Sequence, residues 1–183
     1  ALGADVNSTA SGKTPLHWAA QACHEKMAET LLNAQAQVDA KDEGGRTPLH
    51  WAARSEKCKK LAELLVKAGA NASATDQNGR TPVDFAGLNM AKTLVKLGKL
   101  DNKLNEDLAA AASEGNVAET EKLLALGADV NSTASGKTPL HWAAQGCHEK
   151  VAETLLNAQA QVDARDEGGR TPLHWAARSE KCK

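Results

Sequence analysis

The hydrophobic and polar residues of this chain follow a helical period that is interrupted at regular intervals by polar turns. After Cys23-His24, apolar residues recur at a spacing of three or four positions: Met27, Ala28, Leu31 and Leu32. This spacing predicts an amphipathic helix. Upstream, Thr14 followed by Pro15 is a typical helix start. Leu16 and Ala19-Ala20 then predict a short helix with a face of small side chains.

This predicted helix–turn–helix unit recurs. The sequence Thr-Pro-Leu-His-Trp-Ala-Ala stands at 14–20, 47–53, 138–144 and 171–177, and a degraded copy, Thr-Pro-Val-Asp-Phe-Ala-Gly, stands at 81–87. Successive starts lie 33 residues apart (14 to 47, 138 to 171) or 34 apart (47 to 81). One such unit cannot bury its own apolar side, whereas a row of stacked units can. We therefore expect a solenoid.

Glycines mark the expected ends of several second helices. Gly69, Gly98 and Gly127 stand where a residue in the left-handed region usually ends a helix. Gln35 and Gln159 occupy the corresponding place in two other units. A non-glycine residue in that conformation costs about 1 kcal/mol, so we expect these two helix ends to be strained or altered.

The repeated unit resembles the ankyrin repeat. The residues that carry the resemblance are Asp42, Gly45, Thr47-Pro48-Leu49-His50, Ala52-Ala53, Leu64-Leu65, Gly69-Ala70 and Asn71. The resemblance covers essentially the whole chain. It implies an all-α ankyrin-repeat solenoid of stacked helix–turn–helix units with β-turn fingers. It also implies that the histidines of the repeated motif form hydrogen bonds between neighbouring turns.

The chain can be divided on this basis. We expect complete repeats at 9–41, 42–75 and 133–165, a partial repeat at 166–183, a short C-cap-like repeat at 76–100, an N-cap-like repeat at 101–132, and the end of another N-cap-like repeat at 1–8. Two caps then meet in the middle, joined by 99–103. Whether that segment is a hinge or part of a continuous stack stays open at this point.

A longer period lies on top of the short one. Residues 1–59 and 125–183 are identical at 56 of 59 positions, an offset of 124 residues. The differences are Ala22/Gly146, Met27/Val151 and Lys41/Arg165. Two explanations fit: tandem copies of a 124-residue module, engineered or recently duplicated and seen through a window of a longer array, or a fragment of a natural repeat protein. The near-identity favours the first. Termini within repeats would expose apolar faces, which would allow end-to-end self-association.

Composition narrows the function. Lys and Arg number 22 against 23 Asp and Glu, so no general affinity for nucleic acid or anionic membranes is indicated. No apolar run approaches the roughly 18 residues of a membrane span, and no signal peptide opens the chain. The four cysteines have no Cys-x-x-Cys companion, which favours reduced thiols. We therefore expect a protein of the cytoplasm or nucleus that is not secreted.

The residues give little support to an enzyme. A catalytic base is needed once, beside a nucleophile, whereas His17, His50, His141 and His174 recur with the motif. Cys23-His24 and Cys147-His148 offer only two metal ligands each. No paired carboxylates or phosphate-binding loop are present. We expect no catalytic, cofactor or metal site.

The remaining candidate is a protein-binding surface, because ankyrin partners usually contact the fingers and inner helices. Lys13, Arg46 and Arg80 share one repeat position and predict a basic row, as do Lys137 and Arg170. The tryptophans recur at one helix position and are either binding residues or packing residues between repeats. The candidate partner-binding residues are Trp18, Trp51, Trp142, Trp175, Lys13, Arg46, Arg80, Gln21, Arg54, Lys137, Arg170, Gln145 and Arg178. The partner itself is not identified by the sequence.

Overall fold

A computed structural model describes residues 5–182, and within that range the chain forms helices and no β-strand. The α-helices are α1 (Pro15–Gln21), α2 (Glu25–Asn33), α3 (Pro48–Ala53), α4 (Lys59–Lys67), α5 (Leu88–Gly98), α6 (Asp101–Glu114), α7 (Val117–Leu126), α8 (Pro139–Gly146), α9 (Glu149–Asn157) and α10 (Pro172–Arg178). Three 3₁₀-helices accompany them: η1 (Glu56–Cys58), η2 (Pro82–Phe85) and η3 (Glu180–Cys182). The expected all-α repeat fold is confirmed.

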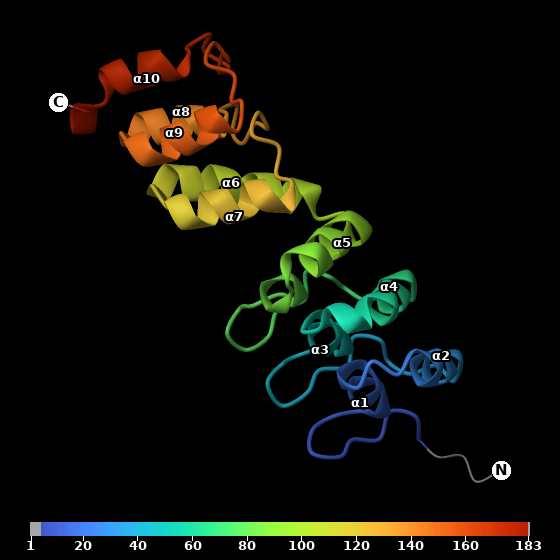
Figure 1. Cartoon of the computed structure of the whole chain (residues 1–183). Helices are drawn as coiled ribbons and strands as arrows, with labels where there is room; N and C mark the ends of the chain where they lie inside the picture. Colours follow the sequence, from blue (N-terminus) through green and yellow to red (C-terminus); the bar gives the residue numbers. More distant parts are fainter. Residues whose placement is uncertain (1–4, 183) are drawn as a thin grey trace. The chain divides into compact units, whose positions relative to one another are not determined.

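The chain divides into two compact units, unit 1 up to Leu100 and unit 2 from Asp101 onward. In unit 1, α1 packs on α3 and α3 on η2, while α2 packs on α4 and α4 on α5 (Figure 1). In unit 2, α8 lies between α6 and α10, and α7 packs on α9. Each unit is thus a stack with a row of inner helices and a row of outer helices.

Buried leucines and alanines hold the stack of unit 1 together. Leu16, Leu49 and Leu65 are fully buried, and alanines such as Ala20 and Ala52 allow neighbouring helices to approach closely. The predicted amphipathic segment forms α2. Its Met27 is nevertheless 55% exposed, whereas Val151 at the equivalent place in α9 is 1% exposed because α7 packs on α9.

Polar bonds to the backbone tie each repeat to the next on the outer side of the stack. The backbone N–H of Gln37 donates to Asn7 Oδ1 at 2.8 Å, and that of Asn71 donates to Asp39 Oδ1 at 3.0 Å. In unit 2 the N–H of Gln161 donates to Asn131 Oδ1 at 2.8 Å. These bonds satisfy loop amides that have no partner within a helix.

The predicted helix ends are right at four positions and wrong at one. Gly69 and Gly127 have positive φ angles of 94° and 104°, and Gln35 and Gln159 also adopt the left-handed region at 63° and 67°. Gly98, however, stays helical, and Lys99 takes the left-handed conformation at 53°. A Cβ on Gly98 would lie 2.7 Å from the Cβ of Ala72, so this glycine serves close packing rather than a turn.

The segment between the caps is shorter than expected. Asp101, Asn102 and Lys103 belong to the first turn of α6, so Lys99 and Leu100 alone separate α5 from α6. No local pattern indicates this helix start, because the first turn of a helix accepts polar residues readily.

The expectation of four reduced cysteines is wrong. Cys23 is bonded to Cys58 and Cys147 to Cys182, with Cα atoms 4.8 and 5.4 Å apart and a sequence separation of 35 in both pairs. Cys23 lies in the turn after α1, and Cys58 lies at the end of η1 in the next repeat. Stacking brings these turns together, so the bridge joins neighbouring repeats, and the absence of a Cys-x-x-Cys motif was the wrong criterion.

Candidate protein-binding surface

The fingers that precede the inner helices are shaped by aspartates. Asp42 Oδ1 accepts hydrogen bonds from the backbone N–H groups of Gly44 and Arg46, both at 2.9 Å. Asp76 Oδ1 does the same with Asn78 and Arg80, at 2.8 and 3.0 Å. Gly45, with a φ of 75°, allows the chain to reverse inside the finger. Each loop therefore places its basic residue directly before a Thr-Pro helix start.

The motif histidines connect each inner helix to the following finger, as the resemblance implied. The backbone N–H of Thr14 donates to His17 Nδ1 at 3.1 Å, so Nε2 carries the ring proton and donates to the carbonyl oxygen of Arg46 at 2.9 Å. His50 reaches the Arg80 carbonyl in the same way, at 3.1 Å. Burial is the largest influence on both rings and lowers the pKa of His17 and of His50.

His141 repeats this arrangement in unit 2, where its Nε2 lies 2.9 Å from the Arg170 carbonyl oxygen. His174 keeps the local half of it, a contact of 2.8 Å between Nδ1 and Thr171 Oγ1. The histidine bonds position the backbone of the residues that precede the next helix. Because the accepting carbonyl groups belong to arginines of the basic row, these bonds also hold the backbone that carries the basic side chains.

The basic row and the tryptophans form one structure rather than two. In unit 1, Lys13 Nζ lies 4.6 Å from the ring centre of Trp18 and 3.7 Å from that of Trp51. The Arg46 guanidinium lies 5.5 Å from Trp51 and 5.5 Å from Phe85. Arg80 follows at 4.6 Å from Phe85. We call the alternating series Trp18, Lys13, Trp51, Arg46, Phe85, Arg80 the cation–aromatic ladder.

Unit 2 contains a shorter ladder. Lys137 Nζ lies 4.3 Å from the ring centre of Trp142 and 3.7 Å from that of Trp175, and Arg170 lies 4.3 Å from Trp175. Burial, followed by the nearby positive charge of Arg170, lowers the pKa of Lys137. In both units a cation contacts the ring of its own repeat and the ring of the next. This pattern repeats because the stacking repeats.

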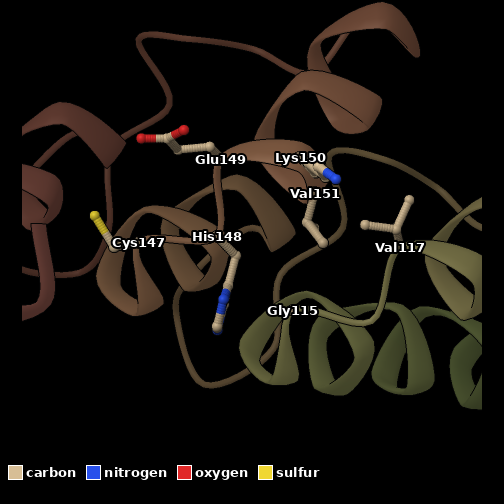
Figure 2. A pocket seen from close by; sticks show the side chains of 7 residues that line it. All are labelled: Gly115, Val117, Cys147, His148, Glu149, Lys150 and Val151. Carbon is tan, nitrogen blue, oxygen red and sulfur yellow. The ribbon is translucent and has the colours of Figure 1, made fainter.

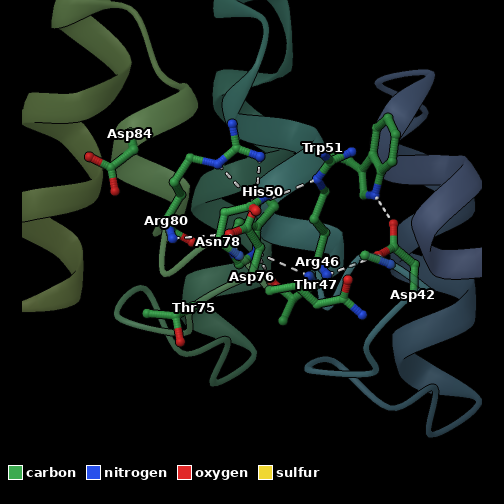
Figure 3. Close-up of polar contacts among 12 residues, drawn as sticks. Asp42, Arg46, Thr47, His50, Trp51, Thr75, Asp76, Asn78, Arg80 and Asp84 are labelled. Atoms are coloured by element: carbon green, nitrogen blue, oxygen red, sulfur yellow. Dashed lines mark hydrogen bonds and ion pairs between the residues drawn. The ribbon is translucent and has the colours of Figure 1, made fainter.

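Most cations of the ladder already have polar partners. Arg80 Nη2 lies 2.9 Å from Asp76 Oδ2, and Arg46 Nε lies 3.8 Å from the same oxygen (Figure 3). Lys13 donates to Gln21 Oε1 at 2.9 Å, and Lys137 donates to Gln145 Oε1 at 3.0 Å. The row predicted from the sequence thus combines arginines that lie beside a carboxylate with lysines that donate to neutral amides.

The electrostatics of the finger aspartates follow from these contacts. Burial raises the pKa of Asp76, but the backbone N–H and guanidinium of Arg80 and the N–H of Asn78 lower it more, to about 2. The pKa of Asp166 is also about 2, where burial is outweighed by donors from Arg170 and Trp175. Both side chains therefore stay ionised at neutral pH and act as fixed anchors.

The tryptophans differ in what their N–H groups contact. Trp51 donates to Asp42 Oδ2 at 2.9 Å, and Trp175 donates to Asp166 Oδ2 at 2.8 Å. Trp142 Nε1 is buried and has no hydrogen-bond partner among the described residues. The residue nine positions before Trp142 is Thr133, where Trp51 has Asp42. Neither carboxylate partner is among the predicted site residues, although an aspartate nine positions before a tryptophan is a signal that the sequence contains.

The remaining predicted residues lie at the ends of the inner helices. Gln21, Gln145, Arg54 and Arg178 are all exposed. Arg54 lies 5.1 Å from the ring centre of Trp51 and adds another cation beside this ring of the ladder. Arg178 ends α10. Trp18 is 45% exposed, while Trp51, Trp142 and Trp175 are half-buried.

A pocket of about 310 Å³ in unit 2 lies between the α6–α7 turn and the start of α9. Figure 2 shows its lining, which includes Gly115, His148 and Val151. His148 Nε2 lies 3.0 Å from the Ser113 carbonyl oxygen. A Cβ on Gly115 would approach the imidazole to 2.5 Å, and a Cβ on Gly146 would clash with the same ring. The pocket is thus lined by a histidine whose hydrogen bond joins two repeats.

No group of three or more metal-binding side chains occurs within the described residues, and no helix among them is long and apolar enough to cross a membrane. The side chains that meet on the inner face are cations, aromatic rings and amides. Such groups can make polar and stacking contacts with another macromolecule. They do not place a nucleophile beside a base.

Comparison with known proteins agrees with this architecture. The model of the family "Ankyrin repeats (3 copies)" matches residues 1–76 and 108–183. The ARF GTPase-activating protein Git of Drosophila melanogaster is 41% identical over 66 residues, which are 36% of this chain and 9% of that protein. The matched part of the chain therefore spans less than a tenth of the length of that relative. With most of its residues matched, and with its helix pairs stacked through finger-linked histidines, the chain belongs to the ankyrin repeat family.

Proposed function

We propose that this chain is a non-enzymatic protein-binding module whose partner contacts the cation–aromatic ladder and the finger tips beside it. Ankyrin repeats act as protein–protein interaction modules. The observation that carries the proposal is the ladder itself, because it leaves a large indole, that of Trp18, 45% exposed beside a lysine. Exposed tryptophans flanked by cations are the kind of residue that dominates binding energy at protein interfaces.

The rigidity of the surface supports the same proposal. Asp42 and Asp76 fix the finger backbones, and His17 and His50 tie them to the preceding helices. A surface that is held in place before binding loses little conformational entropy when it meets a partner. Because Asp76 compensates Arg46 and Arg80, the proposal does not require an acidic partner.

The test compares two exposed apolar residues of unit 1. Trp18 lies on the inner helix α1 and is 45% exposed, whereas Met27 lies on the outer helix α2 and is 55% exposed. Affinity capture from a cell lysate with mass spectrometry is run with the parent, Trp18→Ala and Met27→Ala. Each variant is first checked for an unchanged circular dichroism spectrum. We expect a protein that the parent and Met27→Ala retain and Trp18→Ala loses.

Retention of the same protein by all three chains would contradict a binding role for the ladder. Trp51→Ala adds a second measure, because Trp51 is half-buried and bonded to Asp42. Loss of partner binding with an unchanged Tm would mark Trp51 as a contact residue, while loss of both would assign it to packing.

The two disulfides remove one argument for the predicted cytoplasmic or nuclear location, because that prediction rests partly on reduced thiols.

A second candidate is an architectural, self-associating scaffold. Leu173 on α10 is 77% exposed, whereas Leu16 and Leu49, at the same motif position, are fully buried. An exposed apolar helix face favours association between copies. Self-association is tested by light scattering at protein concentrations that span roughly a hundredfold range in the micromolar region. A mass that rises with concentration in the parent and not in Leu173→Lys would support this function, and a constant monomer would exclude it.

A further inference from the structure

The two disulfides occupy the same place in two different stacks. Cys23 and Cys147 lie in the turn after an inner helix, and Cys58 and Cys182 lie in the 3₁₀-helix after the next inner helix. Neither pair belongs to the ladder or to the fingers. We propose that they are redox-responsive staples, which lock two neighbouring repeats together when oxidised and release them when a small dithiol reduces them.

The two staples differ in the access that a reductant has to their sulfur atoms. Cys58 is 1% exposed, and its Sγ lies 3.7 Å from the Ala20 carbonyl oxygen. Cys23 and Cys147 are half-buried, and Cys182 is exposed. Exchange requires a thiolate to reach a sulfur atom of the bridge. The Cys147–Cys182 staple therefore opens more readily than the Cys23–Cys58 staple.

The reaction is an ordinary thiol–disulfide exchange. A dithiol thiolate attacks Cys23 Sγ or Cys182 Sγ, the protein S–S bond breaks, and the partner cysteine leaves as a thiolate that takes up a proton. The second thiol of the reductant then attacks the mixed disulfide and releases the first cysteine. The dithiol ends as a cyclic disulfide, and the protein gains two electrons and two protons for each staple.

Opening the first staple frees a segment that holds the stack together. Cys58 closes η1, whose first residue, Glu56, accepts a hydrogen bond at 3.0 Å from the backbone N–H of Met90 in the first turn of α5. Arg54, just before η1, contacts the Trp51 ring. The staple thus fixes one segment that contacts both the next repeat and the edge of the ladder, and its loss loosens that junction.

The experiment uses the unmodified chain, first incubated with oxidised glutathione and then with graded dithiothreitol. Free thiols are trapped by acid, labelled with N-ethylmaleimide in denaturant and located by peptide mass spectrometry. Peptides around Cys23 and Cys147 are distinguishable because Ala22 and Met27 differ from Gly146 and Val151. We expect Cys147 to be labelled at a dithiothreitol concentration roughly tenfold lower than Cys23.

A parallel thermal scan measures how reduction of the disulfides changes the stability of the chain. Full reduction is expected to lower the Tm by roughly 5–15 °C, because two cross-links of the unfolded chain are lost. The Cys23→Ser/Cys147→Ser variant should show a Tm that no longer responds to dithiothreitol. Labelling of all four cysteines after glutathione and before any dithiothreitol, equal labelling of Cys23 and Cys147 at every concentration, or an unchanged Tm on reduction would overturn the proposal.

Discussion

At the scale of single residues, the ladder lysines stand out because each serves two indoles. Lys13 Nζ lies against the rings of Trp18 and Trp51, which belong to neighbouring repeats. A cation between two aromatic faces adds electrostatic attraction to the packing of both rings. The lysine therefore contributes to the contact between repeats as well as to the surface chemistry.

Replacing Lys13 by methionine keeps the length of the side chain and removes its charge. We expect Lys13→Met to lower the free energy of unfolding by about 1–2 kcal/mol, the range of partly desolvated cation–π contacts. Urea denaturation followed by tryptophan fluorescence measures it. Lys26→Met on the exposed face of α2 is the matched control and should change stability by less than about 0.5 kcal/mol.

Asp76 predicts a loss of stability in acid. Its pKa is about 2 in the folded protein against an ordinary 3.8, so its contribution is present above pH 4 and is lost as the pH falls toward 2. Asp76→Asn should lower the urea midpoint at pH 7 and flatten its decline between pH 4 and 2. A midpoint at pH 7 equal to that of the parent would show that the ionised carboxylate does not anchor the finger.

His17 and His50 predict a second, milder pH effect. Their pKa values are lowered from 6.5 by burial, so the unfolded chain takes up protons before the folded chain does. The contribution of the two neutral histidines to the free energy of unfolding should therefore be fully present above pH 6.5 and should decline as the pH falls below it. Ring chemical shifts in NMR spectra, compared with those of an unfolded fragment, check that both histidines titrate below 6.5.

At the scale of elements, the junction of one helix pair with the next depends on glycines that make room for a side chain. Gly115 and Gly146 flank the His148 ring, which reaches the Ser113 carbonyl in the last turn of α6. The other copy has Ala22 in place of Gly146, and His24 there is exposed. Gly146 is thus one of the three positions at which the copies differ, and it lies beside the His148 ring.

This arrangement predicts that the effect of Gly146→Ala on the free energy of unfolding changes sign when the His148 ring is removed. Alanine normally stabilises a helix relative to glycine, by about 0.5–1 kcal/mol. In the parent, Gly146→Ala should instead destabilise by about 1 kcal/mol, because the new Cβ displaces His148 from its hydrogen bond. In a His148→Ala background the same change should stabilise. Urea denaturation of the four proteins measures the cycle, and equal effects in both backgrounds would exclude the steric explanation.

At the scale of the whole molecule, the chain consists of two compact stacks, and each has buried residues of its own. The buried cluster of unit 1 extends from Leu16 to Leu94, and unit 2 has its own buried residues, including Leu108 and Leu155. The boundary falls between Leu100 and Asp101. In repeat proteins stability comes from neighbouring contacts, so each stack depends on its own interfaces.

Separate expression of 1–100 and 101–183 tests this independence. We expect both fragments to be helical and to unfold cooperatively, with circular dichroism spectra that sum to that of the intact chain. Each fragment retains one of the two disulfides. An unfolded fragment in the oxidised state would show that contacts across the boundary are required.

The sequence by itself determined the helices, their repetition and the role of the histidines. Apolar spacing and Thr-Pro starts act within a few residues, so they define α1 and α2 without knowledge of the stack. The Thr-Pro-Leu-His motif likewise identifies His17 and His50 as links between turns, through its resemblance to a known repeat. The left-handed ends at Gln35 and Gln159 were also predictable, since their place in the period is conformationally restricted.

The tertiary structure alone decided what meets across the repeats. Cys23 joins Cys58 because stacking brings the turn after α1 close to η1 of the next repeat, and no local motif records that proximity. Lys13 fits between Trp18 and Trp51 because stacking sets the gap between two rings. Gly98 is needed for its contact with Ala72 rather than for its backbone angle. Sequence patterns encode dihedral preference and amphipathicity, whereas these contacts depend on the translation from one repeat to the next.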